Sequence, residues 1–353
     1  MNTDLLKQIC ECPGVSGSET PIRKLIASEL RPLVDEVTVD TMGNVIGTRR
    51  GTGGPRVMLA AHMDEIGFIV KHIDDKGFLR LQPIGGHDPR NMVAQRVYVH
   101  GFRGARFLGA LMPSSKPVHM LSAEEMNRPP KVEDFFVDLG MTGDEVKADV
   151  EIGDAVTMAR TAEIIGANFM SKTLDDRLAV FIMIEALRAL GDHACDIVAV
   201  ATVQEEVGLR GATTAAYEAR PDVGIALDVT IANDFPGASE IDRVSVLGGG
   251  PAIKIMDSSL LCHPKLVRHF RDVAEKHEIK YQLEILPRGG TDAGAIQRSR
   301  GGVPSFTLSV PTRYVHSVNE TSSLADIEAS IQLLARYLED AHTRSYGYDD
   351  DLA

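Results

Sequence analysis

The amino-acid sequence predicts a three-layer α/β/α domain interrupted by a β-rich, barrel-like inserted domain. Two patterns indicate this fold. Short apolar runs without alternation recur between segments of helical periodicity, which is typical of a mixed, mostly parallel sheet covered by helices. Residues 70–162 instead hold closely spaced short β patterns broken by Gly and Pro. We therefore expect residues 1–69 and 163–353 to form one domain around the insert 70–162.

Helical and extended patterns place the elements along the chain. A first amphipathic helix is expected from residue 20 to about residue 37. The apolar runs that predict strands buried on both faces are residues 56–61, 196–203, 223–227 and 305–310. Longer helices are expected at residues 176–190 and 264–279. The acidic residues 348–351 are expected to form a frayed tail.

The composition is that of an ordinary globular protein, with 44% hydrophobic and 25% charged residues among 353. Lys and Arg number 37 against 50 Asp and Glu, which gives a formal charge of -13. Because there is no basic block and no apolar run of about 18 residues, we expect neither a nucleic-acid nor a membrane partner. No secretory leader and no Cys-x-x-Cys pair are present, so a cytoplasmic protein without a thiolate zinc site is expected.

Acidic and imidazole side chains follow the otherwise apolar strands. The carboxyl ends of parallel strands are where open α/β sheets bind ligands, so these side chains are expected to meet. A further carboxylate, Asp175, opens the Asp-Asp-Arg triplet at the expected start of a helix. The residues that come after strands are His62, Glu205, Glu206, Asp228 and, in a following loop, His316.

Each of these residues also has a structural explanation. A histidine beside a strand is more often packed or hydrogen-bonded than a metal ligand. Either Asp175 or Asp176 can cap the helix, the two glutamates can be a solvated pair, and Asp228 can begin a turn. These explanations do not account for the recurrence of such groups after apolar strands, which favours a common site.

Two histidines and four carboxylates without a thiolate suit a particular metal chemistry. This ligand set is typical of hydrolytic zinc, cobalt or manganese centres with open coordination positions. Two divalent ions about 3.5 to 4 Å apart can share one carboxylate. Each ion then needs one histidine and one carboxylate of its own, which leaves one carboxylate free as a base.

The order of these motifs resembles a known family. The motifs run through nearly the whole chain as CPGVSGSE, AAHMDEIGFIV, KTLDDR, VQEEVGLRGA, ALDVT, RGGTDAGAI and HSVNE. Together they are similar to the dinuclear metallo-aminopeptidases of the tetrahedral (TET), glutamyl and deblocking type. The sequence shows no departure at the metal positions that the resemblance implies.

The resemblance implies a role for each candidate residue. Asp175 corresponds to the carboxylate that bridges two metals, and Glu205 to the general base. The remaining ligands are implied to be His62 and Asp228 for one ion, and Glu206 and His316 for the other. Asp64 corresponds to a carboxylate that holds the His62 ring. A cis peptide between Asp175 and Asp176 is also expected.

The resemblance further implies an activity and an assembly. The protein is expected to be a metal-dependent aminopeptidase that removes the N-terminal residue of peptides with two divalent ions per subunit. Zinc or cobalt is expected first and manganese next. The insert is expected to be a dimerisation domain, through which dimers assemble into a hollow tetrahedral dodecamer.

A glycine-rich stretch is a candidate substrate pocket. It consists of Arg288, Gly289, Gly290, Thr291 and Asp292, although glycine clusters more often form structural turns than substrate contacts. A cation, either Arg288 or Lys254, would suit an acidic first side chain. The choice between acidic and neutral substrates stays open.

Two other functions remain as alternatives. A glycosidase of the endoglucanase kind would use paired carboxylates without metal, although the histidines favour a peptidase. A non-catalytic assembly protein would keep a degenerate site, although every expected ligand and the base are present. No P-loop, Gly-x-Ser-x-Gly elbow or His-Glu-x-x-His helix occurs in the sequence.

Overall fold

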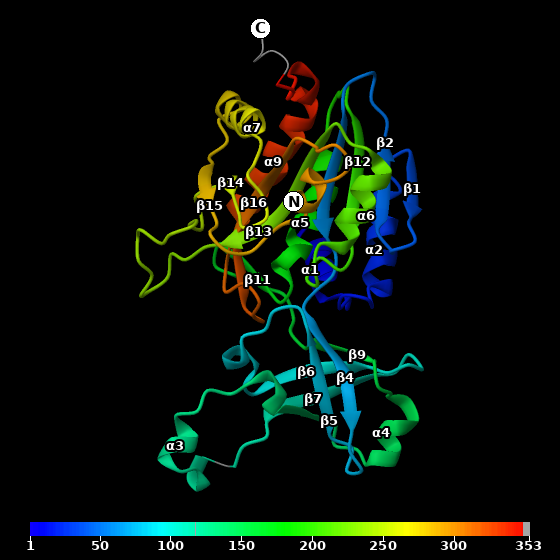
Figure 1. The fold of residues 1–353 in the computed structure, drawn as a ribbon, viewed down its shortest axis with the longest axis vertical. Coiled ribbons are helices and arrows are strands. Elements are labelled where there is room, and N and C mark those ends of the chain that lie inside the picture. The colour runs from blue at the N-terminus through cyan, green and yellow to red at the C-terminus, as the bar shows by residue number, and fades with distance from the viewer. Residues whose placement is uncertain (117, 349–353) are drawn as a thin grey trace.

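The computed structural model describes residues 1–116 and 118–348. The chain forms a large part, in which helices cover a sheet, and a smaller barrel beneath it (Figure 1). This arrangement confirms the expected fold class. Of the acidic tail expected to be frayed, residues 349–351 lie outside the described residues.

Four parallel strands form the centre of the large sheet. Their order is β12-β3-β13-β16, and β12 pairs with β3 so that Thr202 lies opposite His62. Because these strands run the same way, their carboxyl ends meet at one edge of the sheet. Their bounds are Asp196–Thr202 for β12, Arg56–His62 for β3, Val223–Ile231 for β13 and Ser305–Arg313 for β16.

The outer strands join this centre through antiparallel pairing, of β2 with β12 and of β17 and β14 with β16. Within the described residues the path is β1-β2 before β12 and β17-β11-β10 after β16, while β14 pairs with β15 and β16. The sheet is therefore mixed, as expected. Their bounds are Glu36–Val39 for β1, Val45–Arg49 for β2, Glu320–Ser323 for β17, Asn168–Ser171 for β11, Glu163–Ile165 for β10, Ala252–Met256 for β14 and Gln282–Ile285 for β15.

Helices cover both faces of the sheet, which explains the lack of alternation in its strands. In β3, Leu59 packs into the core on one face and Met58 into the core on the other. The first face carries α1 (Thr3–Glu11), α2 (Thr20–Leu30), α5 (Leu174–Ala189), α7 (Pro264–Lys276) and α9 (Leu324–Asp340). The second carries α6 (Arg210–Ala219) and α8 (Asp292–Gln297).

Four expected boundaries were wrong by three residues or more, one of them that of β16, which continues to Arg313 rather than ending at residue 310. The first helix ends at Leu30 rather than near residue 37, because Pro32 has no N–H with which to continue the hydrogen-bond ladder. Helix α7 ends at Lys276 rather than residue 279, since Glu278 adopts a left-handed φ of 54°. Strand β13 continues to Ile231, so Asp228 lies within its carboxyl half rather than after it.

The smaller part is a closed barrel with its own apolar core, which includes Phe68 and Val97. Its strand order is β4-β5-β8-β7-β6-β9. Residues 63–66 lead from β3 into the barrel, and residues 159–162 lead back to β10. The bounds are Gly67–Ile73 for β4, Leu79–Ile84 for β5, Phe135–Asp138 for β8, Arg106–Pro113 for β7, Gln95–His100 for β6 and Ala155–Met158 for β9; α3 (Ala123–Met126) and α4 (Gly143–Asp149) lie beside them.

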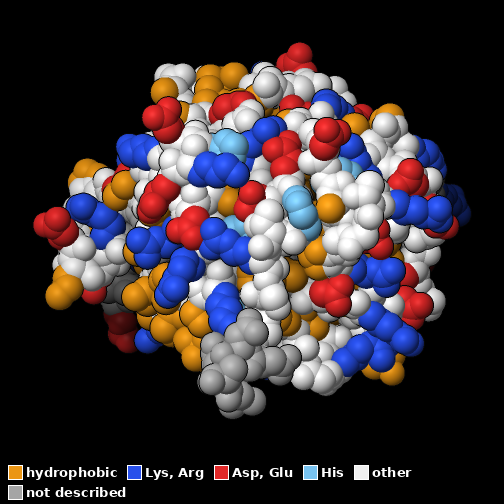
Figure 2. All heavy atoms as spheres, turned by 90° about the horizontal axis from the view of Figure 1, so that it is seen from above, with side chains coloured by type: hydrophobic (Ala, Val, Ile, Leu, Met, Phe, Trp, Pro, Cys, Tyr) orange, Lys and Arg blue, Asp and Glu red, His pale blue; other side chains and the backbone are white. Residues whose placement is uncertain are grey.

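The end of the molecule away from the barrel carries a mixed surface. Basic and acidic side chains are interspersed there rather than gathered by sign (Figure 2). Among the described residues, no helix has both the length and the apolar character needed to cross a membrane.

A stack of aromatic rings stabilises the core between α7, α9 and β16. The ring of Phe270 lies 4.2 Å from that of Phe306 and 4.0 Å from that of Tyr337, measured between centroids. We predict that Phe270→Ala lowers the free energy of unfolding by about 3 to 5 kcal/mol, because it leaves a cavity. Urea unfolding measures this value. The control Leu283→Ala, at an exposed position of β15, should change it by less than about 0.5 kcal/mol; equal effects of both changes would contradict the prediction.

Candidate metal centre

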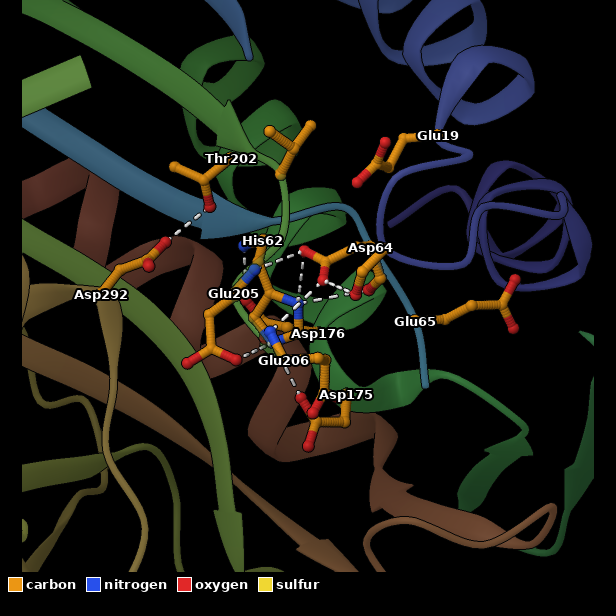
Figure 3. Close-up of polar contacts among 12 residues, drawn as sticks. Glu19, His62, Asp64, Glu65, Asp175, Asp176, Thr202, Glu205, Glu206 and Asp292 are labelled. Carbon is orange, nitrogen blue, oxygen red and sulfur yellow. Dashed lines mark hydrogen bonds and ion pairs between the residues drawn. The ribbon is translucent and has the colours of Figure 1, made fainter. Parts of the chain in front are cut away.

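The candidate residues meet at the carboxyl edge of the sheet, which faces the barrel. They line one open pocket of about 600 Å³. Figure 3 shows several of them pointing toward one another from β3, from the start of α5 and from the loop after β12. The six expected residues that line the pocket are His62, Asp175, Glu205, Glu206, Asp228 and His316.

Asp175 lies between the two histidines. Its Oδ1 is 3.0 Å from Nε2 of His62, and its Oδ2 is 3.3 Å from Nε2 of His316. Burial alone would raise the pKa of Asp175, but the contacts with His316 and His62 hold this pKa well below its usual range. The peptide bond between Asp175 and Asp176 is cis, as expected.

Asp64 connects the first histidine to the two glutamates. The backbone N–H groups of Glu205 and Glu206 donate to its two carboxylate oxygens at 3.0 and 3.3 Å. The hydroxyl of Ser16, in the motif near the start of the chain, donates to Oδ2 at 2.6 Å. Nδ1 of His62 lies 3.6 Å from Oδ1 of Asp64. Nδ1 of His62 also lies 3.2 Å from the backbone carbonyl oxygen of Asp64, so this buried residue contacts three site residues.

Glu320 is a site residue to which the sequence analysis gave no role. This buried side chain accepts the backbone N–H of Asp175 at 3.0 Å and that of His316 at 2.7 Å. Burial and the neighbouring Asp175 carboxylate raise the pKa of Glu320 to about 8. Its signal was present in the HSVNE motif, where it ends the segment that His316 begins.

Asp176 is a second residue of this kind. It was considered only as a helix cap, but its Oδ2 accepts the backbone N–H of His62 at 3.1 Å. Its Oδ1 is buried and has no hydrogen-bond partner within the described residues. Burial, with the nearby charge of Asp228, raises the pKa of Asp176 well above its usual value. Asp176 therefore holds the backbone of His62 in place.

The site holds more buried carboxylate than its own cations can balance. Burial raises the pKa of Glu205, Glu206 and Asp228, each of which lies among other acids. Burial alone would lower the pKa of His316, but the Asp175 and Glu206 carboxylates raise it to about 12. Divalent cations would supply the missing positive charge.

The donor atoms also fit metal ions. Oε1 of Glu206 is buried without a hydrogen-bond partner among the described residues. Two groups of side chains bring their ligand atoms within 4.8 Å of one another; these are His62, Asp175 and Glu206, and His62, Asp176 and Asp228. Imidazole and carboxylate donors without thiolate suit zinc, cobalt and manganese.

The candidate substrate residues do not all reach the pocket. Residues 288–291 line it, and Arg288 is exposed there. Asp292 is buried at the start of α8, where it accepts the hydroxyl hydrogen of Thr202 at 2.5 Å. Lys254 is fully buried and paired with Glu284, so it is not available to a substrate.

The site and fold agree with comparisons to known proteins. The sequence pattern of the M42 glutamyl aminopeptidases matches residues 43–333. The chain belongs to this family. A lysyl aminopeptidase of Pyrococcus furiosus is 40% identical over 349 residues, which cover 96% of this chain and 96% of the relative.

Solved structures give the same result. An aminopeptidase from the archaeon Desulfurococcus kamchatkensis is 39% identical with a TM-score of 0.92, over 96% of this chain and 94% of the other. The TET1 peptidase of Pyrococcus horikoshii is 32% identical with a TM-score of 0.84, over 95% and 98%. The M42 chain is thus a metal-dependent aminopeptidase, a hydrolase of peptide bonds, rather than a glycosidase or an inactive assembly protein.

The contacts of Glu320 generate a prediction for metal binding. In Glu320→Gln, one side-chain oxygen replaces the two that accept the N–H groups of Asp175 and His316, so both backbone segments loosen. We expect metal affinity to fall by about 10- to 100-fold, as for other residues that orient ligands. Competition with a chromogenic chelator measures it. The control Glu240→Gln, on an exposed loop, should bind metal normally, and unchanged affinity in Glu320→Gln would show that the contacts do not hold the ligands.

Proposed function

We propose that the protein removes the N-terminal residue of peptides with two divalent metal ions that share Asp175. The carrying observation is that the two oxygens of this carboxylate face two different imidazoles, at 3.0 and 3.3 Å. A shared carboxylate of this kind is a common feature of two-metal hydrolytic sites. The remaining ligands would be His62 and Asp228 for one ion, and Glu206 and His316 for the other.

Glu205 is proposed as the general base. When bound, the two ions would polarise the scissile carbonyl and acidify the attacking water. Glu205 would accept the proton of that water at its carboxylate and then pass it to the leaving amine. Its side chain lines the open pocket, while its backbone N–H is held by Asp64 at 3.0 Å. Asp64 acts in the same step by holding His62 and the glutamate loop in place.

The substrate's first side chain is proposed to lie against residues 288–291. These residues form one wall of the pocket that also contains Glu205 and the metal ligands. Asp292 supports this wall from below through its contact with Thr202. With Lys254 buried, Arg288 is the candidate that remains for pairing with an acidic first residue.

We infer that the two parts of the chain have different functions. Residues 1–69 and 163–353 would form the catalytic domain, and residues 70–162 the dimerisation domain. The described part of the insert exposes large apolar side chains, which include Phe102, Met120, Met126 and Ile152, and such side chains favour contact with another subunit. The TET1 peptidase of Pyrococcus horikoshii assembles into a tetrahedron or an octahedral shell. By analogy we propose that dimers of this chain assemble into a tetrahedral dodecamer, located in the cytoplasm.

The role of Glu205 can be separated from metal binding. In Glu205→Gln the side chain can no longer accept a proton, so we expect kcat to fall by about 100- to 10,000-fold. Metal content, measured by elemental analysis, should stay at that of the unmodified protein. The control Glu218→Gln, on the exposed surface of α6, should retain full turnover. Full turnover by metal-loaded Glu205→Gln would exclude this residue as the base.

Metal dependence can be tested on the unmodified protein. We expect EDTA to abolish hydrolysis of aminoacyl chromogenic substrates, because the ions would polarise the scissile carbonyl and acidify the attacking water. Zinc or cobalt should restore turnover best, and manganese less. Elemental analysis after reloading should give two ions per subunit. Full activity in the metal-stripped protein would contradict the proposed mechanism.

A further inference from the structure

A second pocket lies where the outside of the barrel meets the helical part. Its volume is about 390 Å³, and it shares no lining residue with the 600 Å³ pocket of the metal centre. Basic and aromatic side chains dominate its wall. They are Arg96, Tyr98, His100, Arg106, Arg160 and Lys172.

The alternation of strand β6 aims these side chains outward. Val97 and Val99 are buried in the barrel core, so Arg96, Tyr98 and His100 stand on the opposite face. The neighbouring strand β7 supplies Arg106, which pairs in register with His100. The guanidinium of Arg106 lies over the Tyr98 ring, 4.4 Å from its centroid, and this contact holds it in place.

Three arginines in this pocket lack an acidic partner. Within the described residues, the side chains of Arg96 and Arg160 make no hydrogen bond or ion pair, and Arg106 contacts only the Tyr98 ring. The deeper cation, Lys172, is already paired with Glu65 at 2.6 Å. The rim carboxylate of Glu11 accepts the backbone N–H of Ala162 at 2.8 Å. The three arginines therefore outnumber the one carboxylate of the pocket wall, Glu11, and leave an excess of positive charge in a chain of net charge -13.

We propose that this pocket binds a compact anion, a carboxylate or phosphate group, through Arg96, Arg106 and Arg160. Guanidinium groups match the oxygens of such anions in a two-pronged geometry. The ligand would contact the barrel strands and the segment that returns from the barrel. Binding of a free anion is independent of the proposed catalytic roles, whereas binding of a substrate carboxylate rests on the proposed function.

Two sources can supply this anion. One is a free anion such as phosphate or citrate, and the other is the C-terminal carboxylate of a peptide substrate. The second source has a structural basis, because Met158 and Lys172 line both this pocket and a narrow one beside Asp175 and Glu206. A short peptide held at the metal centre would extend in that direction.

The first experiment measures phosphate and citrate binding by calorimetry on the metal-loaded protein. In the double variant Arg96→Gln/Arg160→Gln we expect binding to weaken by about tenfold or more. The double variant Arg31→Gln/Arg128→Gln removes the same charge from exposed positions elsewhere and should bind as the unmodified protein does. Anion binding at the metal centre is recognised because it remains in the Arg96→Gln/Arg160→Gln variant.

The second experiment distinguishes the sources. It compares kcat/KM for a tripeptide with a free C-terminal carboxylate and for its C-terminal amide. If the substrate supplies the anion, the unmodified protein prefers the free acid and the Arg96→Gln/Arg160→Gln variant loses that preference. If a free anion is the ligand, the ratio is the same in both proteins while phosphate or citrate binding falls.

The proposal is overturned if the arginine pair changes neither anion binding nor the acid-to-amide ratio relative to the control variant. It is also overturned if the substitutions alter only the native mass, since the arginines would then belong to a contact between subunits. Equal thermal unfolding of both variants without anion establishes that the fold is retained.

Discussion

The crowding of carboxylates beside two histidines at one edge of the sheet is the constraint on which the rest of the site depends. Taking such charges out of water is costly unless opposite charge is close. The chain places Asp175 between His62 and His316, and still leaves Glu205, Glu206 and Asp228 with raised pKa values. The protein's own cations therefore balance this cluster poorly, which agrees with the metal dependence of the family.

Two further carboxylates, Asp64 and Glu320, hold the backbone of this cluster in place. Asp64 accepts backbone N–H groups from the loop after β12, and Glu320 accepts them from the start of α5 and from the His316 loop. Backbone donors can be held in place by the surrounding fold, whereas side-chain partners lose rotamer freedom when they are fixed. The candidate ligands are thus positioned by loops whose backbone is held by Asp64 and Glu320.

Much of the fold and site could be predicted from the sequence because the relevant signals are local. His62 and Glu205 follow apolar runs, and the direction of parallel strands brings such ends together. Asp176 and Glu320 were not assigned, because the contact of Asp176 with His62 and that of Glu320 with Asp175 join groups distant in sequence. The burial of Lys254 could not be predicted either. Its partner Glu284 comes from a different strand, and nothing in the sequence near either residue indicates the pair.

The short connection between sheet and barrel gives the enzyme a mechanical property. Strand β3 ends at His62 and β4 begins at Gly67, so residues 63–66 alone separate a candidate ligand from the barrel. Glu65 in this connection accepts hydrogen bonds from Lys172 and from the backbone N–H of Gly14. These contacts restrict the movement of the connection. A displacement of the barrel by a neighbouring molecule would therefore shift the backbone at His62 as well. The barrel is thus joined to the site by a short, anchored connection and not by a flexible linker.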